Sequence, residues 1–175
     1  MTGLGARLHQ RMRGVGITNL VSVANGEGFG LYQAFKQHGD CRVIEACREG
    51  EAVGICAGLV LGGSVPVLSI ENFGLFECLD TLRALPIALR LPLILVIGYT
   101  GRVGLTPEGE RAMQERLGQI APQAILGARW TEPVLELAGI PYWHIAPDED
   151  AAAFDAAHAQ ALRDSVPVAL LVDLT

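Results

Sequence analysis

The stretch Arg48-Glu-Gly-Glu-Ala-Val-Gly-Ile-Cys-Ala-Gly58 decides how the rest of the sequence is interpreted. It places Glu51 where a short apolar segment gives way to a helix, and the helix continues with small residues at Gly54, Ala57 and Gly58. Residues three and four apart share one face of a helix, so we expect a nearly bare face beside Glu51. Two glycines cost a helix roughly 1 kcal/mol each relative to alanine. Close approach of another backbone or a flat ligand would explain that cost.

Outward from this stretch, short apolar segments alternate with segments of helical pattern. The apolar segments lack the polar alternation of half-exposed strands, which is typical of strands buried on both faces. We predict strands at 17–23, 41–46, 66–70, 93–97, 142–145 and 168–172. We predict helices at 4–13, 29–38, 49–61, 74–89, 109–117, 131–139 and 148–162. This alternation predicts an α/β fold in three layers, α/β/α, around a mostly parallel sheet of about six strands.

Proline, glycine and threonine set the expected boundaries in the second half of the chain. Pro86 should kink the fourth predicted helix. We predict a long irregular stretch at 98–108 and a second loop around 122–127, both marked by glycine and proline. A threonine cap at Thr131 should then begin a helix that Gly139 ends.

Composition bounds the class of protein. The sequence has 175 residues, 50% of them hydrophobic and 18% charged, which suits one domain with apolar surface left for a partner. The net charge of −6, without a basic run, argues against nucleic-acid binding. No window approaches about 18 uncharged apolar residues, and residues 1–13 lack an apolar signal core. We therefore expect no membrane span and a cytoplasmic location.

The cysteines and histidines do not form a recognisable site. The cysteines at 41, 47, 56 and 78 form no C-x-x-C pair and have no histidine at ligand spacing. We expect reduced, partly buried thiols and no metal site within this chain. The loops that matter are instead those after the predicted strands, at 24–28, 46–51, 71–74 and 98–108, because ligands of such folds bind beyond the carboxyl ends of the strands.

The run around Glu51 resembles the pyrimidine-binding (Pyr) domain of thiamine diphosphate enzymes. Residues 48–58 are most similar to the α subunits of sulfopyruvate decarboxylase and to the matching half of phosphonopyruvate decarboxylase. Weaker similarity extends through 66–75, 91–97 and 131–142. The resemblance implies the thiamine diphosphate-binding fold, with residues 1–175 as a single Pyr-type domain.

In that family, the matching glutamate hydrogen-bonds a ring nitrogen of the cofactor's aminopyrimidine. The resemblance implies that Glu51 is both catalytic and cofactor-binding, and that thiamine diphosphate takes up the electrons released when a 2-oxoacid loses carbon dioxide. A partly desolvated carboxyl suits this role, and Ala52, Val53, Ile55 and Cys56 could provide the apolar setting. The alternative is that Glu51 is a first-turn acid that interacts with the helix dipole.

The family holds the diphosphate through Mg2+ bound by a Gly-Asp-Gly motif, which this sequence lacks; Gly39-Asp40-Cys41 is the nearest run. The resemblance therefore implies a partner β subunit, or a separately encoded chain, that holds Mg2+ and the diphosphate. We expect an active site at the interface of a hetero-oligomer such as α2β2 or larger.

Further site residues follow from the same resemblance. Asn72 matches an asparagine in the family's loop after the third strand, and Asn25, Asn72 and Phe73 are the further cofactor-binding candidates. Ala24-Asn25 replaces the proline and polar residue expected after the first strand, Phe73 stands where relatives usually have serine, and Glu71 where they usually have glutamine. Asn72 could instead be a helix N-cap. Arg102 is the candidate for binding a sulfonate or phosphonate group, which arginine pairs with in a bidentate manner. The departures from the family leave the substrate's identity open.

Two other functions compete with this interpretation. The run at 26–30, with Glu45 ending the second strand, is similar to a Rossmann nucleotide site, although Leu31 replaces the third glycine and Glu27 would repel a pyrophosphate. A Pyr-like module kept for assembly or regulation would not require Glu51. We predict the α subunit of a thiamine diphosphate-dependent 2-oxoacid decarboxylase, with sulfopyruvate as the first candidate substrate and phosphonopyruvate as the second.

Overall fold

The central sheet has six strands and is parallel throughout. The computed structural model of the protein describes residues 3–26, 28–39, 41–146 and 152–172. The strands are β1 (Asn19–Ser22), β2 (Arg42–Glu45), β3 (Pro66–Glu71), β4 (Ile94–Gly98), β5 (Tyr142–Ile145) and β6 (Val168–Val172). They lie in the order β2-β1-β3-β4-β6-β5, and every pairing is parallel. The predicted α/β sheet is confirmed.

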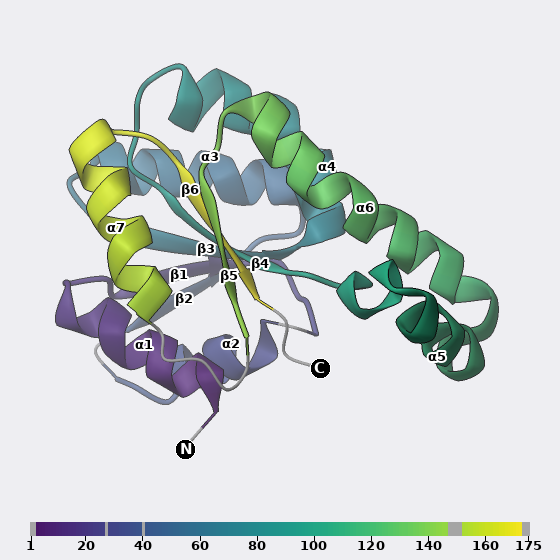
Figure 1. The fold of residues 1–175 in the computed structure, drawn as a ribbon. Coiled ribbons are helices and arrows are strands. Elements are labelled where there is room, and N and C mark those ends of the chain that lie inside the picture. The colour runs from purple at the N-terminus through teal and green to yellow at the C-terminus, as the bar shows by residue number, and fades with distance from the viewer. Residues whose placement is uncertain (1–2, 27, 40, 147–151, 173–175) are drawn as a thin grey trace.

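Helices cover both faces of the sheet (Figure 1). One layer holds α1 (Leu4–Gly14), α2 (Phe29–Lys36) and α7 (Ala152–Asp164), and the other holds α3 (Glu49–Leu61), α4 (Asn72–Leu82) and α6 (Ala121–Ala138). Neighbouring strand residues such as Leu20 and Val21 belong to the cores of opposite layers. This two-sided burial explains why the strands are apolar without alternation.

A smaller unit projects from the body of the molecule. It consists of α5 (Pro107–Leu117), the 3-10 helices η2 (Arg102–Leu105) and η3 (Gly118–Ile120), and the first turns of α6 (Figure 1). Met113, Ala121, Ala124 and Ile125 form a small core of its own. Among the described residues, no helix is both long and apolar enough to span a bilayer.

The predicted irregular stretch at 98–108 is mostly regular. β4 extends to Gly98, η2 occupies Arg102–Leu105, and α5 already begins at Pro107. Thr106 caps α5, because its hydroxyl accepts a hydrogen bond from Gly109 N at 3.1 Å. The Thr-Pro pair is a common helix start. Pro86, by contrast, interrupts the fourth helix as predicted, within a π-helical segment, η1 (Arg83–Ile87).

The second predicted loop, around 122–127, is wrong, because α6 runs without a break from Ala121 to Ala138. Thr131 is therefore not an N-cap; it is buried inside the helix, and its hydroxyl donates to Gly127 O at 2.9 Å. Pro133 lies on the exposed side of the helix. Proline has no backbone N–H, so the carbonyl one turn earlier lacks its helical donor and can bond solvent instead. Gly139 does end the helix, in the left-handed conformation. The predicted start of the last helix, at residue 148, lies outside the described residues.

A carboxylate joins α6 to the β5 edge of the sheet. Glu132 accepts hydrogen bonds from Tyr99 at 2.8 Å and from Tyr142 at 3.1 Å, and His144 Nε2 lies 3.4 Å from it. Burial, and then the hydrogen bond to Glu132, raises the pKa of Tyr142 to about 12. The folded state therefore keeps the phenol proton at a pH at which the unfolded chain has lost it.

We expect the free energy of unfolding to fall as pH rises from about 10 to about 12, since the unfolded tyrosine ionises first in this window. Urea unfolding of the parent and of Tyr142→Phe at several alkaline pH values measures this. The variant should show a shallower fall. An equal fall in both proteins would show that Tyr142 is not responsible.

Candidate functional site

Glu51 lies in the first turn of α3, just beyond the carboxyl end of β2. Its side chain is exposed, and its Oε2 accepts a hydrogen bond from Cys47 N at 3.0 Å. In the described part of the chain, nothing donates to its other oxygen, Oε1. The structure therefore presents a carboxylate that is oriented by one oxygen and open at the other.

Gly54 and Gly58 of α3 lie on the same face as Glu51. A Cβ at Gly54 or Gly58 would meet no atom within 4 Å, so this face is open in the single chain. Ala57 was predicted to share the face, but it is only 4% exposed and packs into the core instead. The open strip consists of Glu51, Gly54 and Gly58.

Three of the four residues predicted to give Glu51 an apolar setting face the core instead. Ala52, Val53 and Cys56 are fully buried against the sheet, whereas Ile55 is half-buried and lies one turn on from Glu51. Full desolvation of the exposed Glu51 carboxylate therefore requires a ligand or another chain above the open strip.

Glu77 of α4 holds the start of α3 in place. Its Oε2 accepts a hydrogen bond from Gly50 N at 2.7 Å, and its Oε1 accepts from Arg48 Nε at 3.1 Å and Nη2 at 2.8 Å. Glu49 packs against Gly74, where a Cβ would overlap its side chain. These contacts fix the turn that carries Glu51. The role of Glu77 could not be inferred from the sequence, because no local signal connects it to a turn on another helix.

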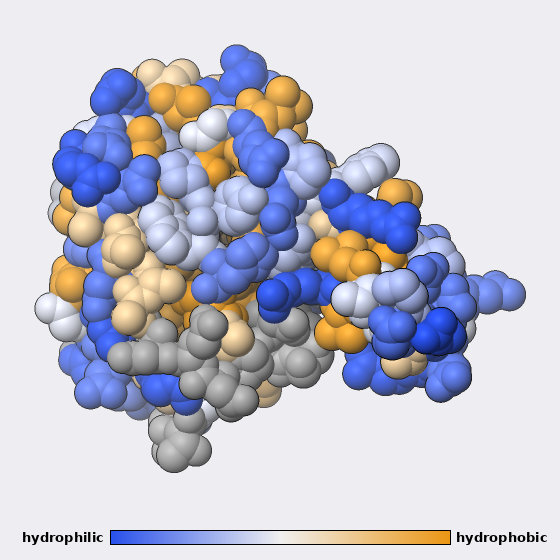
Figure 2. Space-filling view, in the orientation of Figure 1, coloured by the Kyte–Doolittle hydropathy of each residue, from blue (hydrophilic) through white to orange (hydrophobic). Residues whose placement is uncertain are grey.

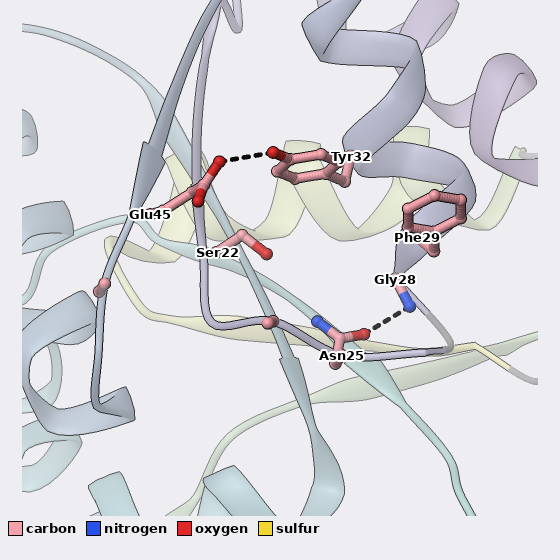
Figure 3. A pocket seen from close by; sticks show the side chains of 8 residues that line it. Ser22, Asn25, Gly28, Phe29, Tyr32 and Glu45 are labelled. Carbon is pink, nitrogen blue, oxygen red and sulfur yellow. Dashed lines mark hydrogen bonds between the residues drawn. The ribbon is translucent and has the colours of Figure 1, made fainter.

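Asn25 builds the loop after β1. Its Nδ2 donates to Val23 O at 2.9 Å, and its Oδ1 accepts from Gly28 N (Figure 3). Gly26 N donates to Glu71 Oε1 at 3.2 Å, which joins this loop to the end of β3. The cofactor-binding role of Asn25 stays a prediction. Glu27, which entered the Rossmann alternative, lies outside the described residues.

Asn72 is the first residue of α4 and is fully buried. It makes no cap; its Nδ2 donates to Thr100 O at 3.0 Å and to Thr131 Oγ1 at 3.1 Å. The N-cap alternative is therefore wrong, and the side chain joins the loop after β4 to α6. The ring of Phe73, 40% exposed, lies against Gly127 of α6. Contact of either residue with a cofactor stays a prediction.

Arg102 lies in η2, beyond the carboxyl end of β4, and is half-buried. β1 and β3 separate β4 from β2, so the ends of β2 and β4 lie roughly 14 Å apart at the usual strand spacing. The substrate-binding role of Arg102 stays a prediction.

The cysteines are free thiols, as predicted. Cys56 and Cys78 are buried, and burial raises the pKa of Cys78 to about 12. Such thiols remain protonated and unreactive at neutral pH. Among the described residues, no group of three acidic, cysteine or histidine side chains is arranged to hold a metal ion.

The chain is similar in sequence to known decarboxylase subunits, although no family model matches it. It is 31% identical to the sulfopyruvate decarboxylase subunit alpha of Methanocaldococcus jannaschii, over 74% of this chain and 69% of that protein. The subunit alpha of Methanococcus maripaludis is 27% identical, over 77% and 72%. The phosphonopyruvate decarboxylase of Streptomyces viridochromogenes is 26% identical over 92% of this chain, which spans 38% of that protein.

Solved structures share the fold. The benzoylformate decarboxylase of Polynucleobacter necessarius superimposes with a TM-score of 0.70 at 20% identity, over 99% of this chain. The thiamine diphosphate-dependent 4-hydroxybenzoylformate decarboxylase of Rhodococcus jostii RHA1 gives a TM-score of 0.70 at 14% identity, over 97% of this chain. The chain spans 30% of each of these longer chains.

We expect Glu77→Ala to lower the free energy of unfolding by about 1–3 kcal/mol, because Gly50 N and Arg48 lose their common acceptor. Asp80→Ala is the matched control, since Asp80 is an exposed carboxylate of the same helix whose one partner among the described residues is Arg83. It should cost less than about 1 kcal/mol. Urea unfolding measures both, and equal costs would contradict the anchoring role of Glu77.

Proposed function

The chain belongs to the family of sulfopyruvate decarboxylase α subunits, and we propose that it supplies the pyrimidine-binding half of a thiamine diphosphate-dependent 2-oxoacid decarboxylase. The proposed reaction converts sulfopyruvate to sulfoacetaldehyde and carbon dioxide. The relatives named sulfopyruvate decarboxylase subunit alpha support this substrate, because they match over more than two thirds of their own length.

The open carboxylate of Glu51 is the observation that carries the proposal. One oxygen is held by Cys47 N, and the other is free to bond a ring nitrogen of an aminopyrimidine. The empty space above Gly54 and Gly58 admits a flat ligand or a second backbone beside the carboxylate. These residues therefore fit the pyrimidine end of the cofactor.

When bound, thiamine diphosphate supplies the electron sink for the loss of carbon dioxide from a 2-oxoacid. The protein's part is to place Glu51 and to hold or move one proton at its free oxygen. Glu77 serves this part by fixing the first turn of α3, and Cys47 N fixes the carboxylate within that turn. Burial of Glu51 on assembly would strengthen its hydrogen bond to the ring.

We propose that a β subunit completes the site and holds Mg2+ and the diphosphate, with residues 1–175 acting as a single Pyr-type domain in an α2β2 or larger assembly. The relatives' designation as subunit alpha supports a partner. So does apolar surface on the projecting unit and its neighbours: Phe73, Val103, Leu105, Leu126 and Trp130 are each at least 40% exposed. Figure 2 shows apolar surface where the projection joins the body. Exposed apolar patches commonly mark protein interfaces.

Phosphonopyruvate is the second candidate substrate, supported by the similarity to a phosphonopyruvate decarboxylase over 92% of this chain. Both compounds combine a carboxylate with a second acidic group, for which Arg102 is the proposed ligand. The rates of carbon dioxide release from each compound alone, compared as kcat/KM, would decide between them.

We expect Glu51→Gln, co-expressed with the β subunit, to lower carbon dioxide release from sulfopyruvate by about 100-fold or more, because the amide cannot share a proton with the ring. Asp80→Asn is the control, an exposed carboxylate remote in sequence from the open strip, and it should retain parental turnover. Normal turnover in Glu51→Gln would contradict the mechanism. If the parental complex releases no carbon dioxide from any 2-oxoacid, the chain is an assembly module instead.

A further inference from the structure

A pocket of about 300 Å³ opens at the carboxyl ends of β1 and β2, against α2. Its lining includes Ser22, Asn25, Gly28, Phe29, Tyr32 and Glu45 (Figure 3). Volumes of this size are typical of sites for small molecules.

This pocket is separate from the open strip of α3. Along β2, Val43 packs with the α1, α2 and α7 layer, whereas Ile44 packs with the α3, α4 and α6 layer. Side chains alternate along a strand, so Glu45 points to the same layer as Val43 and bonds to Tyr32 of α2. Glu51 begins a helix of the opposite layer.

Glu45 contributes a carboxylate that is paired with Lys36 through one oxygen and open at the other. Its Oε1 accepts hydrogen bonds from Tyr32 and, at 3.3 Å, from Lys36. Among the described residues, none donates to Oε2. The hydrogen bond from Tyr32, and then that from Lys36, lowers the pKa of Glu45, so the carboxylate stays ionised at neutral pH.

Two aromatic rings lie beside this carboxylate. The rings of Phe29 and Tyr32 lie nearly parallel, at 15° with centroids 6.3 Å apart, and Phe29 is 58% exposed. Lys36 donates to the Tyr32 hydroxyl at 2.6 Å, which holds the second ring in place. On the opposite side of the pocket, Gly28 N donates a hydrogen bond to Asn25 Oδ1, so neither group is available to bond a ligand.

We propose that this pocket binds a small flat organic cation, an amidinium or a protonated amino-heterocycle. Its charged end pairs with the free oxygen of Glu45, and its ring lies against Phe29, because the Lys36 ammonium already contacts the Tyr32 ring, 4.9 Å from the centroid. A charged hydrogen bond and cation–π attraction both favour such a ligand. The open oxygen of Glu45 only accepts hydrogen bonds, so it pairs with neither end of a sulfonated 2-oxoacid, and this ligand is not the proposed substrate. The inference does not depend on the proposed function.

Benzamidine, a flat amidinium, is the probe, and benzamide is its neutral isostere. Each is titrated into the intact chain, and the amide resonances of Gly28 and Tyr32 are followed by NMR. We expect benzamidine to bind at least about ten-fold more tightly than benzamide, since only the cation forms the charged pair. Equal affinity, or no binding of benzamidine, would overturn the proposal.

Variants test the location of the site. Glu45→Gln should weaken benzamidine about ten-fold and leave benzamide unchanged, whereas Phe29→Ala, an exposed position, should weaken both. Glu51→Gln should have no effect on either probe. If Glu51→Gln rather than Glu45→Gln weakens benzamidine, the cation binds at the open strip and the proposal is wrong.

Discussion

The hydrogen bonds that Glu77 accepts from Gly50 N and Arg48 are the constraint on which the candidate site depends. A loop at the end of a parallel strand has no neighbour to complete its backbone bonds, so its geometry must come from side chains. Here the Glu77 carboxylate on α4 accepts the backbone N–H of Gly50 in the first turn of α3 and pairs with the charge of Arg48. The direction of Glu51 follows from that attachment.

The same principle extends along the carboxyl edge of the sheet. Glu71 joins the loop after β1 to β3, and Asn72 joins the loop after β4 to α6 through Thr131. Polar residues that the sequence marks as candidates for binding a ligand thus also hold the loops in place through hydrogen bonds. The result is an edge on which Glu51 keeps one oxygen open beside a bare strip of helix.

The sequence predicted the sheet and α3 well, because long apolar runs and the Glu51 segment carry local signals. It failed at α6, where residues 122–127 and Thr131 looked like helix breaks. In the structure Gly127 packs under Phe73 and Thr131 is hydrogen-bonded to Asn72. These tertiary contacts outweigh the weak helix propensity of both residues, so the helix continues through them. Glu77 could not be predicted for a related reason, since its partners lie 27 and 29 residues away.

The central claim is that this chain holds half of a cofactor site and that a partner holds the rest. Calorimetric titration of thiamine diphosphate with Mg2+, into the chain alone and into its complex with a co-expressed β subunit, tests it most directly. The account predicts binding to the complex at least about ten-fold tighter than to the chain alone. Equal affinity in both samples, or no binding in either, would contradict it.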